Sequence, residues 1–132
     1  MNQRTPYSFG RIIAAPFAPT VDRLRAALQE QGFGILSEIN VQEKLREKLQ
    51  VSFRPYLILG ACNPPLAHRA LSAEPDLGTL LPCNVVVYAE GDDSTVVTAM
   101  DPVAILGLVD NPEIAPIARQ VRQLLKTAMA SL

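Results

Sequence analysis

Tryptophan is absent from this 132-residue chain, histidine occurs once, cysteine twice, and aromatic residues make up only 5% of the total. One histidine and two cysteines cannot supply the four ligands of a structural zinc site unless a carboxylate or a second subunit completes it, so we expect no bound metal ion. Phosphate-binding glycine loops, nucleophile elbows and His-Glu-x-x-His helices are missing too. These absences exclude the usual sequence signatures of nucleotide-binding, serine-hydrolase and zinc-protease sites.

Charge of one sign and long apolar runs are also lacking. The 12 basic and 13 acidic residues give a net charge of −1, so no extended positive surface is available for nucleic acid. The longest apolar segments, 57–59 and 85–89, are too short to span a bilayer, and the polar first seven residues do not resemble a signal peptide. We therefore expect no nucleic-acid or membrane partner, and a cytoplasmic protein whose cysteines are free thiols.

Hydrophobic residues, by contrast, make up 48% of the chain, enough to build the core of a single domain over residues 1–132. Alternating apolar residues bounded by turn residues predict five strands, at residues 7–13, 33–39, 56–61, 84–90 and 95–100. Apolar residues at helical spacing, with Asn or Asp at the expected caps, predict helices at residues 19–31, 41–49 and 63–73, after 101–102 and after 111–112.

The turn at residues 91–94 joins the last two strands as a hairpin, so at least part of the sheet is antiparallel. One sheet with helices packed on one face is the economical way to bury all of these apolar stripes. The sequence therefore predicts an α+β fold with a mainly antiparallel, five-stranded sheet.

Two Cys-Asn dipeptides stand out as candidate sites. Cys62-Asn63 follows a predicted strand and precedes a helix that begins at Pro64. Free N–H groups and the helix dipole at such a helix start favour an anion, and they lower the pKa of a nearby thiol. The alternative interpretation is a small buried hydrophobe at a tight turn, which is the commonest environment of a free cysteine.

The second dipeptide, Cys83-Asn84, stands where a loop enters a strand, directly after Pro82. Taken alone this is more often a packing motif than a site. His68, on the helix after Cys62, has the only side chain whose ordinary pKa lies near neutrality, although a lone histidine on a helix is more often a solvated surface residue. The candidate ligand-binding residues are therefore Cys62, Asn63, Cys83, Asn84 and His68, and we assign no catalytic residue and no cofactor.

Several of these segments together resemble a known family, the domain of unknown function 302 family of small bacterial and archaeal proteins. The matching segments include residues 32–34, 59–64, 80–85 and 101–102, and the resemblance extends from Phe17 to Leu125. It implies a fold similar to that of the TATA-binding protein, β-α-β4-α with extra short helices in the connections, and it implies a homodimer. It implies no activity, because a shared fold does not carry function with it.

Three functional hypotheses remain open. The leading one is a small-ligand or cofactor-binding protein with a pocket near the two Cys-Asn motifs. The second is a thiol-based redox or catalytic protein that uses Cys62. The third is a non-catalytic structural or interaction homodimer in which both cysteines are simply packed.

Overall fold

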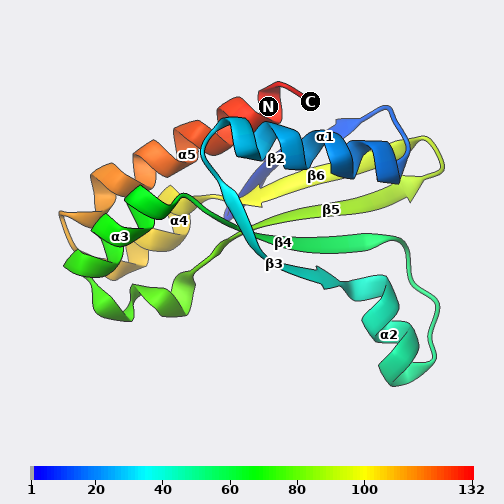
Figure 1. The fold of residues 1–132 in the computed structure, drawn as a ribbon, viewed down its shortest axis with the longest axis horizontal. Helices are drawn as coiled ribbons and strands as arrows, with labels where there is room; N and C mark the ends of the chain where they lie inside the picture. The colour runs from blue at the N-terminus through cyan, green and yellow to red at the C-terminus, as the bar shows by residue number, and fades with distance from the viewer. Residues whose placement is uncertain (1) are drawn as a thin grey trace.

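The computed structural model describes residues 2–132. One antiparallel sheet holds six strands in the order β1-β2-β6-β5-β4-β3 (Figure 1). The strands are β1 (Asn2–Thr5), β2 (Ser8–Ile13), β3 (Gly34–Asn40), β4 (Tyr56–Cys62), β5 (Cys83–Gly91) and β6 (Ser94–Met100). The helices are α1 (Phe17–Glu30), α2 (Val41–Leu49), α3 (Pro64–Ala73), α4 (Pro102–Leu106) and α5 (Ile114–Ala130), with short 3-10 helices η1 (Pro75–Leu80) and η2 (Gly107–Val109).

The predicted α+β class and antiparallel sheet are confirmed, but the predicted count of five strands is wrong. The sixth strand is β1, whose residues are mostly exposed and carry no apolar alternation. It is held by backbone pairing with β2, in which Asn2 lies opposite Gly10. An edge strand of this kind gives no periodic signal, because neither of its faces is buried.

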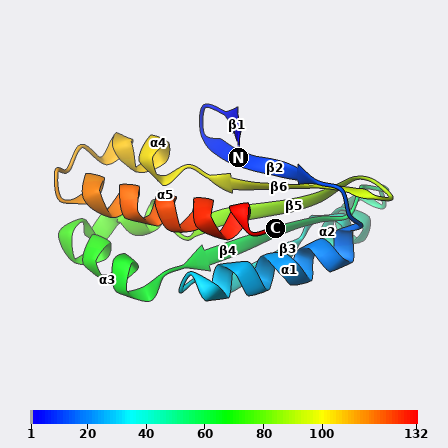
Figure 2. The ribbon, with the colours of Figure 1, turned by 90° about the horizontal axis from the view of Figure 1, so that it is seen from above.

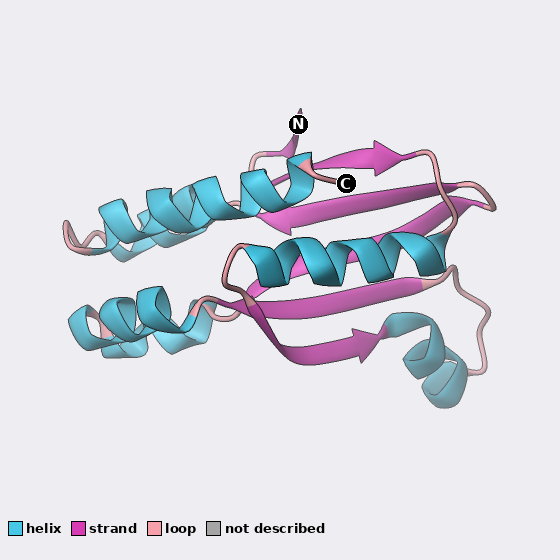
Figure 3. Cartoon of the chain, turned by 45° about the horizontal axis from the view of Figure 1, so that its top comes forward, coloured by secondary structure: helices cyan, strands magenta, loops and turns pink. Residues whose placement is uncertain are grey.

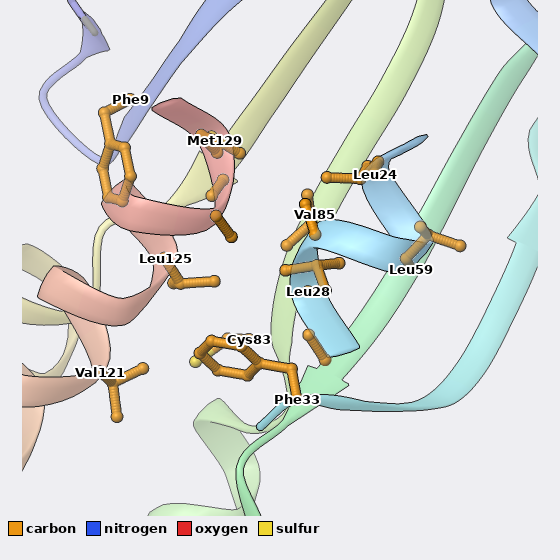
Figure 4. Packing of buried hydrophobic residues seen from close by; sticks show 14 of the residues in the cluster. Phe9, Leu24, Leu28, Phe33, Leu59, Cys83, Val85, Val121, Leu125 and Met129 are labelled. Atoms are coloured by element: carbon orange, nitrogen blue, oxygen red, sulfur yellow. The ribbon is translucent and has the colours of Figure 1, made fainter. Parts of the chain in front are cut away.

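Helices α1 and α5 cover one face of the sheet and bury the core between them (Figure 3). Leu28 of α1 and Leu125 of α5 are fully buried above Leu59 and Val85 of the sheet (Figure 4). Each such side chain contributes roughly 1.5–3 kcal/mol through the apolar area that it removes from water. These side chains belong to one buried hydrophobic cluster, which is the core of the protein.

Polar contacts hold α5 at its C-terminal end and near its middle. Arg11 of β2 donates from Nη1 to the carbonyl oxygens of Met129 and Ala130 in the last turn of the helix, at 3.1 and 3.2 Å. Near the middle of α5, buried Asp101 makes the second contact; it also accepts from the backbone N–H of Val103 at 3.0 Å and so caps α4. The same Asp101 oxygen lies 3.3 Å from Nε of Arg122 on α5, an ion pair that ties α4 to α5.

Helix α2 lies apart from this layer, at the β3 edge of the sheet (Figure 1). Its predicted cap is confirmed, because Oδ1 of Asn40 accepts the N–H of Glu43 at 3.0 Å. None of its nine residues, all of which are described, is buried. The apolar stripe that predicts this helix therefore does not pack in the core.

The close approach of β2 to β6 at Gly10 gives a test of how these two strands pack. A Cβ added at Gly10 would lie 2.0 Å from the carbonyl oxygen of Val97 and 2.7 Å from Cα of Thr98. We expect Gly10→Ala to lower the free energy of unfolding by about 3 kcal/mol or more, since the strands must separate to admit the methyl group. Urea unfolding followed by circular dichroism measures the change.

The matched control is Gly107→Ala, because nothing lies within 4 Å of a Cβ at Gly107 and its backbone is in the right-handed helical region. That variant should be neutral, or more stable by up to about 1 kcal/mol. Equal stabilities of the two variants would contradict the packing of β2 against β6.

Candidate functional site

A cavity of about 240 Å³ lies at the end of the sheet where β4 stops and β5 begins. Helices α3, α4 and α5 extend beyond the strands on this side (Figure 2), and residues of all three helices line the cavity. Almost every lining residue is apolar; the lining comprises Phe33, Leu36, Ala61, Cys62, Asn63, Leu66, Ala67, Ala70, Leu71, Leu77, Leu81, Pro82, Cys83, Leu106, Ile117 and Val121.

Helix α3 presents one stripe of side chains to this cavity. Leu66, Ala67, Ala70 and Leu71 follow helical spacing, and Leu66 and Ala70 are buried. The helix begins where it was predicted to begin, because Oδ1 of Asn63 accepts the N–H of Leu66 at 3.3 Å. Two alanines in the stripe leave the space that larger side chains would fill.

Two leucines mark the mouth of the cavity. Leu36 is 69% exposed and Leu71 is 38% exposed, although both line the cavity. Leu36 owes its position to an irregularity in β3 between Ile35 and Ser37, which interrupts the alternation predicted for this strand. A molecule that enters here therefore meets apolar side chains first.

The two cysteines lie on neighbouring strands and are both free thiols. Cys83 is buried and lies opposite Ala61 in the pairing of β4 with β5, so Cys62 is one residue out of register with it. Burial raises the pKa of both thiols, and for Cys83 it does so to about 11, with a smaller contribution from the neighbouring Cys62. Neither thiol is activated as a thiolate by its surroundings.

The expected anion site at the start of α3 is not formed. Pro64 and Pro65 carry no N–H, the N–H of Leu66 is taken by the side chain of Asn63, and the N–H of Ala67 by the carbonyl oxygen of Asn63. Within the described chain, this helix start offers no free donor to a carboxylate, a phosphate or a thiolate. The prediction assumed free N–H groups at this helix start, but the two prolines and the two contacts with Asn63 leave none.

The structure brings together only some of the predicted site residues. Cys62, Asn63 and Cys83 line the cavity. Asn84 is exposed and lines a separate groove on the sheet, with Tyr56 and Tyr88. His68 is also exposed, and it lies in a shallow depression with Arg69, Ser72 and Glu113, away from the cysteines.

Sequence reasoning missed the residues that form most of the cavity wall. Phe33, Leu77 and Ile117 are buried apolar side chains, and they are separated by about 40 residues each along the chain. The spacing that marks them as buried is the same for a filled core and for a cavity. No signal in the sequence distinguishes the two.

Among residues 2–132, no group of three or more His, Cys, Asp or Glu side chains is placed to hold a metal ion. Over the same residues, no helix has both the length and the apolar character needed to cross a membrane.

Comparison with known proteins gives a family and a structural relative. Residues 11–132 match the family model described as "Domain of unknown function DUF302". The chain is similar to the crystal structure of an uncharacterized conserved DUF302 protein from Bacillus stearothermophilus, with a TM-score of 0.86 and 31% sequence identity over 94% of this chain and 96% of the other. No curated protein matches the chain.

The raised pKa of Cys83 predicts slow alkylation. At pH 8 a thiol with a pKa of about 11 is roughly 0.1% thiolate, against about a quarter for an unperturbed cysteine. The more basic thiolate recovers about a factor of ten in nucleophilicity. We therefore expect iodoacetamide to modify Cys83 in the folded protein at least about 20-fold more slowly than a free cysteine, with Cys62 reacting faster than Cys83.

Mass spectrometry of single-cysteine variants, Cys62→Ala and Cys83→Ala, reads the two rates separately. When urea unfolds each variant, the alkylation rate of its remaining cysteine should rise to that of a free thiol. Faster-than-free alkylation of Cys62 in the folded state would contradict the environment described for it and would support a thiolate mechanism.

Proposed function

The chain belongs to the DUF302 family, and we propose that it is a binding protein for a small, uncharged, largely apolar molecule held in the cavity beside Cys62 and Cys83. The observation that carries this proposal is the cavity itself: about 240 Å³ of space with an apolar lining and a rim of exposed leucines. Pockets that bind small molecules are concave, mostly apolar and equipped with few polar groups.

The volume of the cavity limits the size of the ligand. An apolar cavity of about 150 Å³ already accepts benzene, and this one is larger, at about 240 Å³. At about 30 Å³ per water-sized group, it holds roughly eight heavy atoms. The ligand is therefore a compact molecule of that size, or the end of a longer chain that enters between Leu36 and Leu71.

The chemistry of the lining excludes a charged group from the interior. The lining contains no Lys, Arg, Asp or Glu among the residues described, and a buried charge without a partner is strongly disfavoured. The polar groups at the wall are the thiols of Cys62 and Cys83 and the side chain of Asn63. The Asn63 oxygen is engaged in capping α3, which leaves its amide nitrogen as a donor for a single carbonyl or hydroxyl oxygen of the ligand.

A thiol redox role is the second candidate. The position of Cys62 and Cys83 on adjacent strands favours it, whereas the raised pKa of both thiols opposes it. Treatment with the oxidant diamide separates the two proposals. If the wild-type protein loses about 2 Da because Cys62 and Cys83 form a disulfide, and if Cys62→Ala and Cys83→Ala bind the ligand as tightly as the wild type, the cysteines serve redox chemistry.

A substitution that fills the cavity tests the binding proposal. Ala67→Leu adds three carbons to the cavity-facing stripe of α3, and it should weaken binding of toluene or 1-octanol at least tenfold by occupying their space. In the wild-type protein we expect saturable binding of one molecule per chain, with a rise in melting temperature that follows ligand concentration. Isothermal titration calorimetry measures the affinity.

The matched control is Ala26→Leu, the same change at an exposed position of α1 that does not line the cavity. It should leave the affinity unchanged. If neither probe binds the wild-type protein, or if both variants lose affinity equally, the cavity is not a ligand site.

A further inference from the structure

A groove of about 420 Å³ lies on the face of the sheet opposite α1 and α5, and residues of five strands line it (Figure 3). Side chains alternate along a strand. Val85 and Val87 of β5 are fully buried in the core, so Tyr88 beside them points to this opposite face. We call the groove the tyrosine groove, because Tyr7, Tyr56 and Tyr88, all three tyrosines of the chain, line it.

An irregularity in β1 turns an arginine and a threonine into this groove. The pairing of β1 with β2 shifts its register between Gln3 and Thr5, and Arg4 is the extra residue between them. Neighbouring residues of a regular strand point to opposite faces, but a bulge breaks this alternation and redirects side chains. Arg4 and Thr5 therefore both line the tyrosine groove although they are consecutive in the chain.

The turn between β1 and β2 is anchored next to Arg4. Oγ1 of Thr5 and Oγ of Ser8 lie 2.6 Å apart, and Oγ1 of Thr5 also accepts the N–H of Tyr7 at 3.1 Å. The carbonyl oxygen of Tyr7 accepts the N–H of buried Asp101 at 2.8 Å. Tyr7 itself stays 59% exposed. The turn thus holds two hydroxyl groups in place and leaves the Tyr7 side chain open to a ligand.

The other two tyrosines form an aromatic wall of the groove. The rings of Tyr56 and Tyr88 stack with their centroids 5.3 Å apart and their planes within 7°. Burial raises the pKa of the Tyr56 phenol, with smaller contributions from Tyr88 and Tyr7, so at neutral pH the phenol is protonated and can donate a hydrogen bond. Aromatic side chains bind other rings in offset-stacked or edge-to-face arrangements. This wall therefore favours a planar ring as ligand.

Arg4 supplies the charge of the groove. Among residues 2–132, no Lys, Asp or Glu lines the groove, and Arg4 makes no ion pair; its Nη2 lies 3.5 Å from the Tyr88 hydroxyl. The guanidinium of Arg54 lies over the Tyr88 ring, 5.6 Å from the centroid, but it shares a separate depression with Glu90 and Asp92. The uncompensated charge is therefore that of Arg4, and a guanidinium matches a carboxylate in shape as well as in charge.

We propose that the tyrosine groove binds a small aromatic carboxylate, whose carboxylate lies at Arg4 beside the hydroxyls of Thr5 and Ser8 and whose ring lies against the tyrosines. The guanidinium, hydroxyl and amide groups of the lining all carry hydrogens that a carboxylate accepts. Asn84, which the sequence predicts as a ligand-binding residue, adds its exposed amide to them. The site is separate from the apolar cavity, which excludes a charged group.

The volume of the groove limits the size of this acid. At about 30 Å³ per water-sized group, about 420 Å³ holds roughly 14 heavy atoms. A carboxylate on two fused rings, such as 2-naphthoate with about 13 heavy atoms, is of that size. A ligand of this size with ordinary efficiency per atom binds with a dissociation constant of about 1 mM or tighter.

Titration of the nitrogen-15-labelled full chain with 2-naphthoate, followed by NMR of the backbone amides, tests the proposal. We expect saturable shifts at groove residues such as Ser8, Asn84 and Thr98, and none in α3, which lines the cavity. The uncharged 2-naphthamide should bind about tenfold more weakly, because it cannot form the charge-assisted hydrogen bonds to Arg4. Decahydro-2-naphthoate, which has the charge but no planar ring, should also bind more weakly.

Two variants test the residues assigned to the carboxylate. Arg4→Gln removes the charge at an exposed position of an edge strand, so we expect the fold to be kept. It should weaken 2-naphthoate about tenfold and leave 2-naphthamide unchanged. Asn84→Asp places a carboxylate in the groove with little change in shape and should also weaken 2-naphthoate. The matched control is Arg23→Gln, at an exposed position of α1 outside the groove, and it should bind like the wild type.

The proposal is overturned if 2-naphthoate on the order of 10 mM, well above the expected dissociation constant, shifts no groove signal. Shifts centred on α3, equal affinities for 2-naphthoate and 2-naphthamide, or equal affinities of Arg4→Gln and Arg23→Gln would overturn it too. None of these results decides the fate of the cavity as a ligand site, because the test of the cavity uses uncharged probes and a variant at Ala67.

Discussion

Two helices must cover a sheet of six strands, and this constraint shapes the rest of the molecule. Helices α1 and α5, of 14 and 17 residues, bury one face of the sheet between them. The opposite face receives no helix, and the short helices α3 and α4 are placed beyond the ends of the strands (Figure 2). Because α3 and α4 have no strand beneath them, their side chains meet across the end of the sheet and enclose space instead of filling it.

The chemistry of that space follows from its position at the end of the core. Its walls are core residues, so the two thiols that reach it are surrounded by apolar atoms, which favours the protonated form of each. The same burial that makes Cys83 a poor nucleophile makes the cavity a good environment for an apolar molecule. A site built for nucleophilic chemistry would place its thiol beside donors or cations, and the paired prolines at the start of α3 remove the nearest donors.

Both the cavity and the uncovered face of the sheet exist because, of the helices described, only α1 and α5 pack on a face of the sheet (Figure 3). The two surfaces differ in size and in the side chains that line them. The cavity is small, open at one side and nearly without polar groups. The opposite face of the sheet carries the groove lined by Tyr7, Tyr56 and Tyr88, with Arg4 and Arg54 in contact with Tyr88. Asn63 lines the cavity and Asn84 lines the groove on the opposite face, so the two asparagines lie on different surfaces although each follows a cysteine that lines the cavity.

The sequence by itself determined the local structure. Alternation predicts five of the six strands, and Asn40, Asn63 and Asp101 predict helix starts because a capping side chain acts on the N–H groups of its own next turn. It could not predict β1, whose pairing is made by backbone groups that every residue carries. Only the tertiary structure decided that Cys62 and Cys83 share a cavity while His68 lies outside it, because spacing along a chain shows that a side chain is buried and not what it is buried against.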